Sequence, residues 1–151
     1  MPVQKRFRSQ KLRQRKLNLP SLNPQASAVF DASAILAVLL SEPGSDRVLP
    51  VLEGGGLSTV NLIEVHTRMI TLGADPARVW NRVLDFQCQI CPFTESQARV
   101  AAELFTATRP YGLSLGDRAC LALAIERKAK VYTTDRSWKS IPLPIEVEVI
   151  R

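Results

Sequence analysis

SLGDRACLALAIERKAKVYTTD, residues 114–135, decides the fold class because it predicts a helix that leads at once into a buried strand. Ser114 and Asp117 form a capping box, the pattern that marks the first turn of a helix. Residues 119–125 are apolar almost all round, as in a helix buried on most sides. Residues 131–134 form the strand, and Asp135 follows it directly. This order is typical of an α/β protein.

The rest of the chain repeats the alternation of strands and helices. Thr94 opens a further helix through a capping box with Gln97, and alternating apolar and acidic residues near the C-terminus favour an edge strand. The other expected strands are 28–31, 57–59, 88–93 and 145–150, and the other expected helices are 33–40, 45–52, 61–72 and 76–86. The pattern predicts a three-layer α/β/α sandwich with a mostly parallel central sheet.

Charge divides the 151 residues into two parts. Residues 1–27 hold seven of the 20 Lys and Arg residues and none of the 14 acids. We interpret them as a basic, disordered N-terminal extension; a nucleic-acid-binding arm, an organelle transit peptide and an unused upstream start are open alternatives. Residues 28–151 have the length and composition of one globular domain.

The expected location is cytoplasmic. No run of 18 or more apolar residues is present, which indicates no membrane span, and no apolar segment follows the basic stretch as in a signal peptide. The three cysteines are an odd number, which favours free thiols in a reducing compartment.

Four acids lie where a strand ends or a helix begins: Asp31, Glu64, Asp117 and Asp135. Each has a local alternative, because Asp31, Asp117 and Asp135 could cap helices or turns and Glu64 could pair with Arg68. In an open α/β sheet, however, ligands bind beyond the carboxyl ends of the strands, where such acids converge. Grouped carboxylates need a cation between them, and an oxygen-only cluster suits Mg²⁺ or Mn²⁺. The pattern predicts a metal-dependent enzyme acting on a phosphodiester.

Three stretches resemble the PIN-domain family, and more narrowly the VapC-type toxins of bacterial type II toxin–antitoxin pairs. They are VFDASAILAVLLSEPG at 29–44, LSTVNLIEVHTRMI at 57–70 and GLSLGDRACLALAIERKAKVYTTDRSW at 112–138. The resemblance covers residues 28–151. It departs from the family at residues 1–27, because many such toxins begin almost at the first strand.

The resemblance implies a site and a reaction. Asp31, Glu64, Asp117 and Asp135 would hold one or two Mg²⁺ or Mn²⁺ ions, and Asp117 or Glu64 would take a proton from the attacking water. The expected reaction is endonucleolytic hydrolysis of a structured RNA, such as tRNA or ribosomal RNA, leaving a 5′-phosphate. The supporting polar residues would be Ser33, Asn61 and Thr133 or Thr134.

Cations and partners follow from the same resemblance. Arg118, Arg136 and Lys139 are candidates for RNA phosphate contacts, or alternatively for salt bridges within the acidic edge. A small VapB-type antitoxin would neutralise the toxin. The apolar residues 34–40 and 48–52 would line its groove or a homodimer face; their alternative is ordinary core.

Two other functions remain open from the residues. A nucleic-acid-binding module without catalysis is one. An aspartate-dependent phosphatase is the other, but Asp31-Ala32-Ser33 lacks the second acid that such enzymes carry after the first strand.

Overall fold

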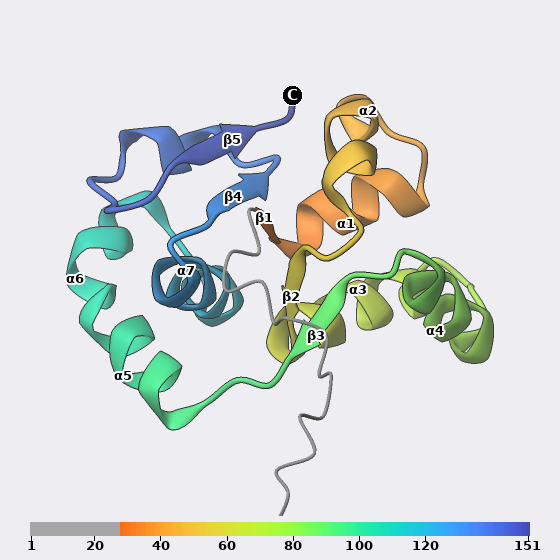
Figure 1. Cartoon of the computed structure of the whole chain (residues 1–151), viewed down its shortest axis with the longest axis horizontal. Coiled ribbons are helices and arrows are strands. Elements are labelled where there is room, and N and C mark those ends of the chain that lie inside the picture. Colours follow the sequence, from red (N-terminus) through yellow and green to blue (C-terminus); the bar gives the residue numbers. More distant parts are fainter. Residues whose placement is uncertain (1–27) are drawn as a thin grey trace, which may run out of the picture.

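The computed structural model describes residues 28–151 and places a parallel sheet at their centre (Figure 1). The described strands, α-helices and 3-10 helices (η) are β1 (Ala28–Phe30), α1 (Ala32–Leu39), α2 (Ser45–Val48), η1 (Leu49–Val51), β2 (Gly56–Ser58), α3 (Thr59–Thr71), α4 (Pro76–Asp85), β3 (Gln89–Cys91), α5 (Glu95–Glu103), α6 (Phe105–Thr108), η2 (Arg109–Tyr111), α7 (Leu115–Arg127), β4 (Lys130–Thr133), η3 (Arg136–Ser140) and β5 (Val147–Val149). The predicted basic extension, residues 1–27, lies outside the described residues.

The sheet has five strands in the order β3-β2-β1-β4-β5, and every neighbouring pair is parallel. Val29 in the central strand is in register with Gly56 on one side and with Val131 on the other. Because all strands run the same way, their carboxyl ends meet at one edge of the sheet. The predicted α/β class with a parallel sheet is confirmed.

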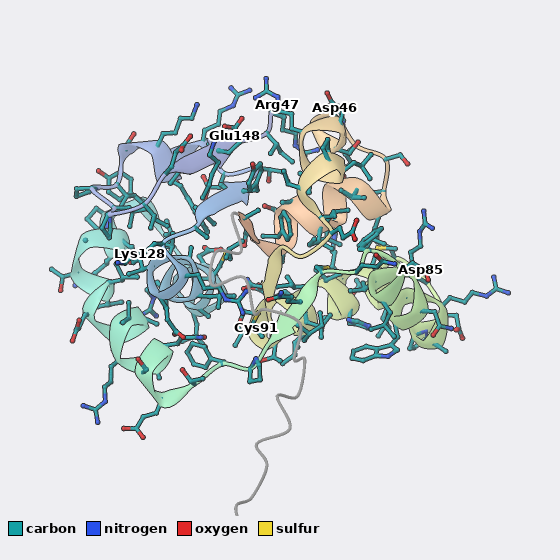
Figure 2. The ribbon with its side chains drawn as sticks, in the orientation of Figure 1. Asp46, Arg47, Asp85, Cys91, Lys128 and Glu148 are labelled. Atoms are coloured by element: carbon teal, nitrogen blue, oxygen red, sulfur yellow. The ribbon has the colours of Figure 1, made fainter. Side chains whose placement is uncertain are left out.

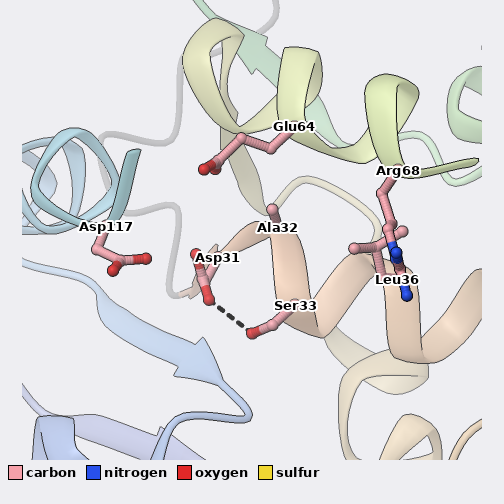
Figure 3. Close-up of a pocket in the computed structure, with 7 residues that line it drawn as sticks. All are labelled: Asp31, Ala32, Ser33, Leu36, Glu64, Arg68 and Asp117. Atoms are coloured by element: carbon pink, nitrogen blue, oxygen red, sulfur yellow. Dashed lines mark hydrogen bonds between the residues drawn. The ribbon is translucent and has the colours of Figure 1, made fainter. Parts of the chain in front are cut away.

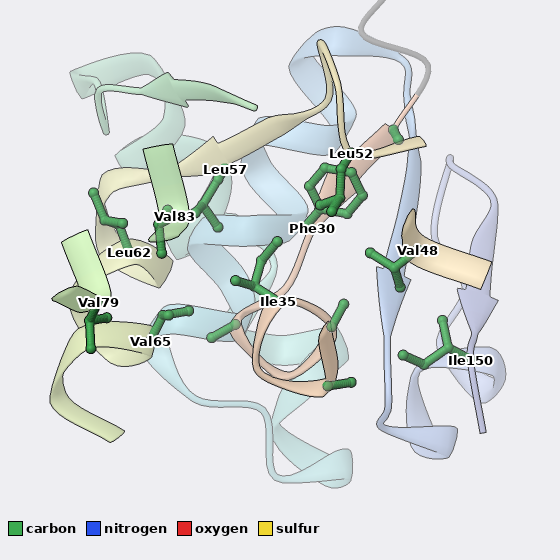
Figure 4. Packing of buried hydrophobic residues seen from close by; sticks show 14 residues of the cluster. Phe30, Ile35, Val48, Leu52, Leu57, Leu62, Val65, Val79, Val83 and Ile150 are labelled. Atoms are coloured by element: carbon green, nitrogen blue, oxygen red, sulfur yellow. The ribbon is translucent and has the colours of Figure 1, made fainter. Parts of the chain in front are cut away.

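Helices cover both faces of the sheet, as Figure 1 shows, with α1 to α4 on one side and α5 to α7 on the other. Phe30 and Val29 are neighbours in β1 and point to opposite faces, as alternate strand residues must. Phe30 packs with Ile35, Leu57 and other buried side chains against α1 to α4 (Figure 4). Val29 packs in a second cluster with residues of α7 and η3.

The C-terminal edge strand is also tied to the rest of the fold by charge. Figure 2 shows Arg47 of α2 beside Glu148 of β5, with Nη1 of Arg47 3.1 Å from Oε1 of Glu148. Both side chains are partly exposed to solvent, so this pair contributes little stability, about 0–1 kcal/mol.

Most predicted elements exist, and the differences have local causes. The expected helix 45–52 is divided into α2 and η1. Pro50 has no N–H to donate to the preceding turn, which explains the change to 3-10 geometry. The expected strand 88–93 is only Gln89–Cys91, since Pro92 follows it and cannot donate to a ladder. Within residues 28–151 no helix has the length and apolar character needed to cross a membrane.

Candidate active site

Asp31 lies directly after β1 and is almost completely buried, with 5% of its surface exposed. Its side chain does not cap α1. Instead, Oδ2 accepts hydrogen bonds from Ser33 Oγ at 2.6 Å and from Thr133 Oγ1 at 3.0 Å. Burial raises the pKa of Asp31 to about 6; the bonds from Ser33 and Thr133 oppose this rise, and the charges of Asp117 and Glu64 add to it.

The hydroxyl groups around Asp31 connect the ends of β1 and β4. Ser33 Oγ accepts a hydrogen bond from the backbone N–H of Thr134 at 3.0 Å, and Thr133 Oγ1 accepts one from the N–H of Asp135 at 3.1 Å. Of the two threonine candidates, Thr133 therefore supports Asp31 through its side chain, and Thr134 contributes its backbone N–H to the same network. Because these bonds join two neighbouring strand ends, they hold the Asp31 carboxylate in one orientation.

Glu64 reaches the site from the second turn of α3. Asn61, which is fully buried, donates from Nδ2 to Glu64 Oε2 at 3.0 Å and to the backbone oxygen of Gly116 at 3.1 Å. Burial raises the pKa of Glu64; the bond from Asn61 opposes this rise, and the Asp117 charge adds to it. Asn61 thus orients Glu64 and also joins α3 to the first turn of α7.

Gly116 makes the approach of Glu64 to α7 possible. A Cβ atom at position 116 would lie 2.6 Å from both Cδ and Oε2 of Glu64, closer than real contacts allow. This role of Gly116 was not predicted. A glycine in the first turn of a helix, directly before a candidate acid, is the one local sign of it, and that sign does not show which side chain comes close.

Asp117 belongs both to the cap at the start of α7 and to the acidic site. Its Oδ2 accepts a hydrogen bond from the N–H of Ser114 at 2.8 Å, and its own N–H donates to Ser114 Oγ at 3.1 Å. The predicted capping box is therefore confirmed. Burial raises the pKa of Asp117; the Ser114 bonds oppose the rise, and Asp135 adds to it. Asp117 can therefore cap the helix and still be part of the acidic site.

Three of the four predicted acids line one pocket of about 300 Å³ at the carboxyl ends of the strands (Figure 3). Asp31, Glu64 and Asp117 point toward one another there, and Ser33 and Arg68 also line it. Asp135 is outside this lining; its Oδ1 caps η3 by accepting from the N–H of Ser137 at 2.9 Å. Asp135 is still near enough for its charge to raise the pKa of Asp117.

Each acid presents one oxygen to the fold and leaves the other without a hydrogen-bond donor in residues 28–151. The bound oxygens are Oδ2 of Asp31, Oε2 of Glu64, Oδ2 of Asp117 and Oδ1 of Asp135. The pKa values of Asp31, Glu64 and Asp117 are raised by burial and in part by a neighbouring acid, and an oxygen-only donor set of this kind fits a hard divalent cation. In the described part of the chain, no three His, Cys, Asp or Glu side chains already stand in a cation-holding group. Because Mg²⁺ is usually held by one or two carboxylates and keeps several waters, an ion bound to the acids as they stand would complete its coordination with water.

The cations predicted to contact RNA lie apart from the pocket. Arg118 donates from Nη1 to the backbone oxygen of Ala101 at 3.1 Å, and its guanidinium lies 5.1 Å from the Phe105 ring centre. Arg136 donates from Nε to the backbone oxygen of Arg151 at 3.3 Å, and Lys139 is exposed on η3. Within residues 28–151, none of the three forms a salt bridge with the acids.

The acidic site lies at the carboxyl edge of a parallel sheet and is built from β1, α3, α7 and the end of β4. These features place the protein among the α/β proteins with candidate metal sites. The PIN domain profile matches residues 28–143, and the chain belongs to the PIN domain family. Comparison with curated proteins gives no match.

Solved structures show the same fold at low sequence identity. A toxin–antitoxin complex from Klebsiella pneumoniae is 19% identical, with a TM-score of 0.63 over 77% of this chain and 93% of that one. VapBC2 from Rickettsia felis, bound to a promoter DNA fragment, is 17% identical, with a TM-score of 0.63 over 80% and 96%. VapBC from Salmonella typhimurium, bound to DNA, is 16% identical, with a TM-score of 0.62 over 81% and 96%.

Proposed function

We propose that this PIN-domain protein is a divalent-metal-dependent endoribonuclease and the toxin of a VapBC-type pair. The observation that carries the proposal is the set of free carboxylate oxygens, one on each of the four acids. Three of these acids line one pocket at the edge of the sheet where α/β proteins bind ligands. The toxin role is proposed because solved structures with the same fold include toxin–antitoxin complexes.

The residues divide the work of the reaction. When bound, Mg²⁺ or Mn²⁺ supplies Lewis acidity, activating a water and stabilising charge on the phosphodiester. Ser33 and Thr133 hold Asp31 by one oxygen and leave Oδ1 for the ion. Asn61 holds Glu64 in the same way, and the raised pKa of Glu64 suits Oε1 to accept the proton of the water.

The decisive test is cleavage of total bacterial RNA by purified protein with Mg²⁺ or with EDTA. We expect discrete new 5′-phosphate ends with Mg²⁺, lost with EDTA and lost in Asp117→Asn. Asp75→Asn is the matched control, because Asp75 also accepts a backbone N–H in a helix cap, that of Arg78 at 3.0 Å, but on α4 outside the pocket. RNA that stays intact with bound metal would instead favour a module without catalysis or a phosphatase.

The antitoxin is the second part of the proposal. A groove lined by Leu39, Met69, Ala74, Arg78, Val79 and Arg82 is apolar with basic residues among its lining, which suits an apolar peptide carrying acids. Of the predicted groove residues 34–40, Leu39 lines it, while Ala34, Ile35 and Ala37 are buried core. Residues 48–52 do not line it, and Val48 and Leu52 are buried.

A VapB-type partner should inhibit cleavage when the two proteins are co-purified. Leu39→Asp should weaken the complex, whereas Leu49→Asp, at an exposed position outside the groove, should not. Equal effects of the two changes would place the antitoxin elsewhere. The proposal includes a homodimer, to be tested by light scattering of the purified protein.

A further inference from the structure

Arg68 is the single cation among the residues that line the acidic pocket. It lies one helical turn after Glu64 on α3, and both side chains reach the pocket. Figure 3 shows them pointing apart: the Glu64 carboxylate is directed toward Asp117, whereas the Arg68 guanidinium extends past Leu36 of α1. The pocket therefore has an acidic end and a basic end.

The spacing of Glu64 and Arg68 would allow an ordinary ion pair along the helix. The structure does not use it, because Glu64 Oε2 is bound by Asn61. Within residues 28–151 the guanidinium of Arg68 forms no salt bridge and no hydrogen bond, and the residue is exposed. Its donors are thus available to a ligand in the pocket.

The chemistry of the guanidinium limits what that ligand can be. Its planar set of N–H donors matches the oxygens of a phosphate, to which arginine binds through two parallel hydrogen bonds. A single-stranded RNA backbone carries phosphates in series, so one phosphate can lie at the acids while its neighbour lies at the arginine. The acids alone would repel both.

We propose that Arg68 is a phosphate-binding residue that anchors the RNA backbone at a phosphate next to the one that is cleaved. This inference rests on the proposed ribonuclease function and adds the subsite that sets the position of the strand across the pocket. Arg68 would act on substrate binding, and the metal site would not depend on it.

The experiment separates binding from cleavage by using the Asp117→Asn background. A fluorescent single-stranded RNA is titrated over a range of NaCl concentrations, and the slope of log affinity against log salt is measured. Arg68→Ala should weaken binding by about 5- to 30-fold and reduce the slope by about 0.7, the value for one phosphate contact on a single strand. Arg68→Lys should keep most of the slope.

Arg109→Ala is the matched control, since Arg109 is exposed on η2 outside the pocket and its loss changes the charge equally. Melting temperature and Mn²⁺ affinity should be unchanged or higher in Arg68→Ala. Equal RNA binding in the Arg68 and Arg109 variants would overturn the inference while leaving a cleaving protein a ribonuclease. A wild-type protein that neither binds nor cleaves RNA would overturn the proposed function itself.

Discussion

The carboxylate of Glu64 occupies the space in which a side chain at position 116 would lie, 2.6 Å from Glu64 Cδ. Asn61 fixes this arrangement from the other side, because one amide group binds both Glu64 and the backbone of Gly116. The position of the Glu64 carboxylate beside α7 thus depends on one residue having no side chain, and it brings two candidate ligands, Glu64 and Asp117, into one pocket.

Gly116→Ala should destabilise the protein by about 0.5–1.5 kcal/mol, because the added methyl group displaces the Glu64 carboxylate and breaks its hydrogen bond with Asn61. In a Glu64→Ala background the clash is gone, and the same change should be neutral or stabilising by up to about 1 kcal/mol, because alanine favours a helix over glycine. Urea unfolding of the four proteins in this cycle measures both values. An equal cost in the two backgrounds would show that Glu64 is not the neighbour that matters.

The burial of Asp31 predicts a pH-dependent stability in metal-free protein. Its folded pKa of about 6 lies above its ordinary value of 3.8, so the folded state holds the proton more tightly. The stabilisation is complete below pH 3.8 and is lost as the pH rises through about 6, with a loss of about 2–3 kcal/mol by pH 7. Asp31→Asn should remove this component, so the variant should gain stability over the wild type as the pH rises.

That comparison requires urea unfolding of both proteins in EDTA at pH 4.5 and 7.5. Other carboxyl groups titrate in both proteins, so the difference between the two proteins is the measured quantity. A difference that stays constant with pH would mean that the pKa of Asp31 in the folded protein is close to its ordinary value.

Bound divalent metal should offset the loss of stability caused by repulsion among the acids. At pH 7.5 we expect Mn²⁺ or Mg²⁺ to raise the melting temperature, with stabilisation reaching about 2.7 kcal/mol at a hundred times the dissociation constant. The shift should be smaller at pH 5, where protons compete for Asp31. Thermal melting should show the shift reduced more in Asp117→Asn than in Asp135→Asn, because Asp135 does not line the pocket. Equal shifts in wild type and Asp31→Asn would place the metal elsewhere.

The double use of Asp117 predicts that its two functions can be separated. Asp117→Ala removes the acceptor for the Ser114 N–H and should cost about 0.5–2 kcal/mol. Asp117→Asn keeps an acceptor oxygen and should cost less, yet both changes should abolish cleavage. Asp75→Ala should cost a similar amount at the cap of α4 and leave cleavage intact. Cleavage retained by Asp117→Asn would assign this residue to folding alone.

The strand ends and caps could be predicted because their signals are local. The pattern around Ser114 and Asp117 and the apolar run before Asp31 each lie within a few residues. The roles of Gly116 and Arg68 could not be predicted in this way, because they depend on how close α3 comes to α7 and to α1. The division of 45–52 did have a local signal, because Pro50 lies inside the expected helix.

Asp31 and Asp117 should be retained to different extents in a descendant of this protein that has lost its activity. Asp117 caps α7, so selection for folding alone would still keep it. Asp31 is buried and its pKa is raised, so its ionised form destabilises the fold. In a descendant that no longer needs the activity, Asp31 should be replaced early. Among relatives of this chain, a neutral residue at position 31 would therefore be a better sign of lost activity than any change at position 117.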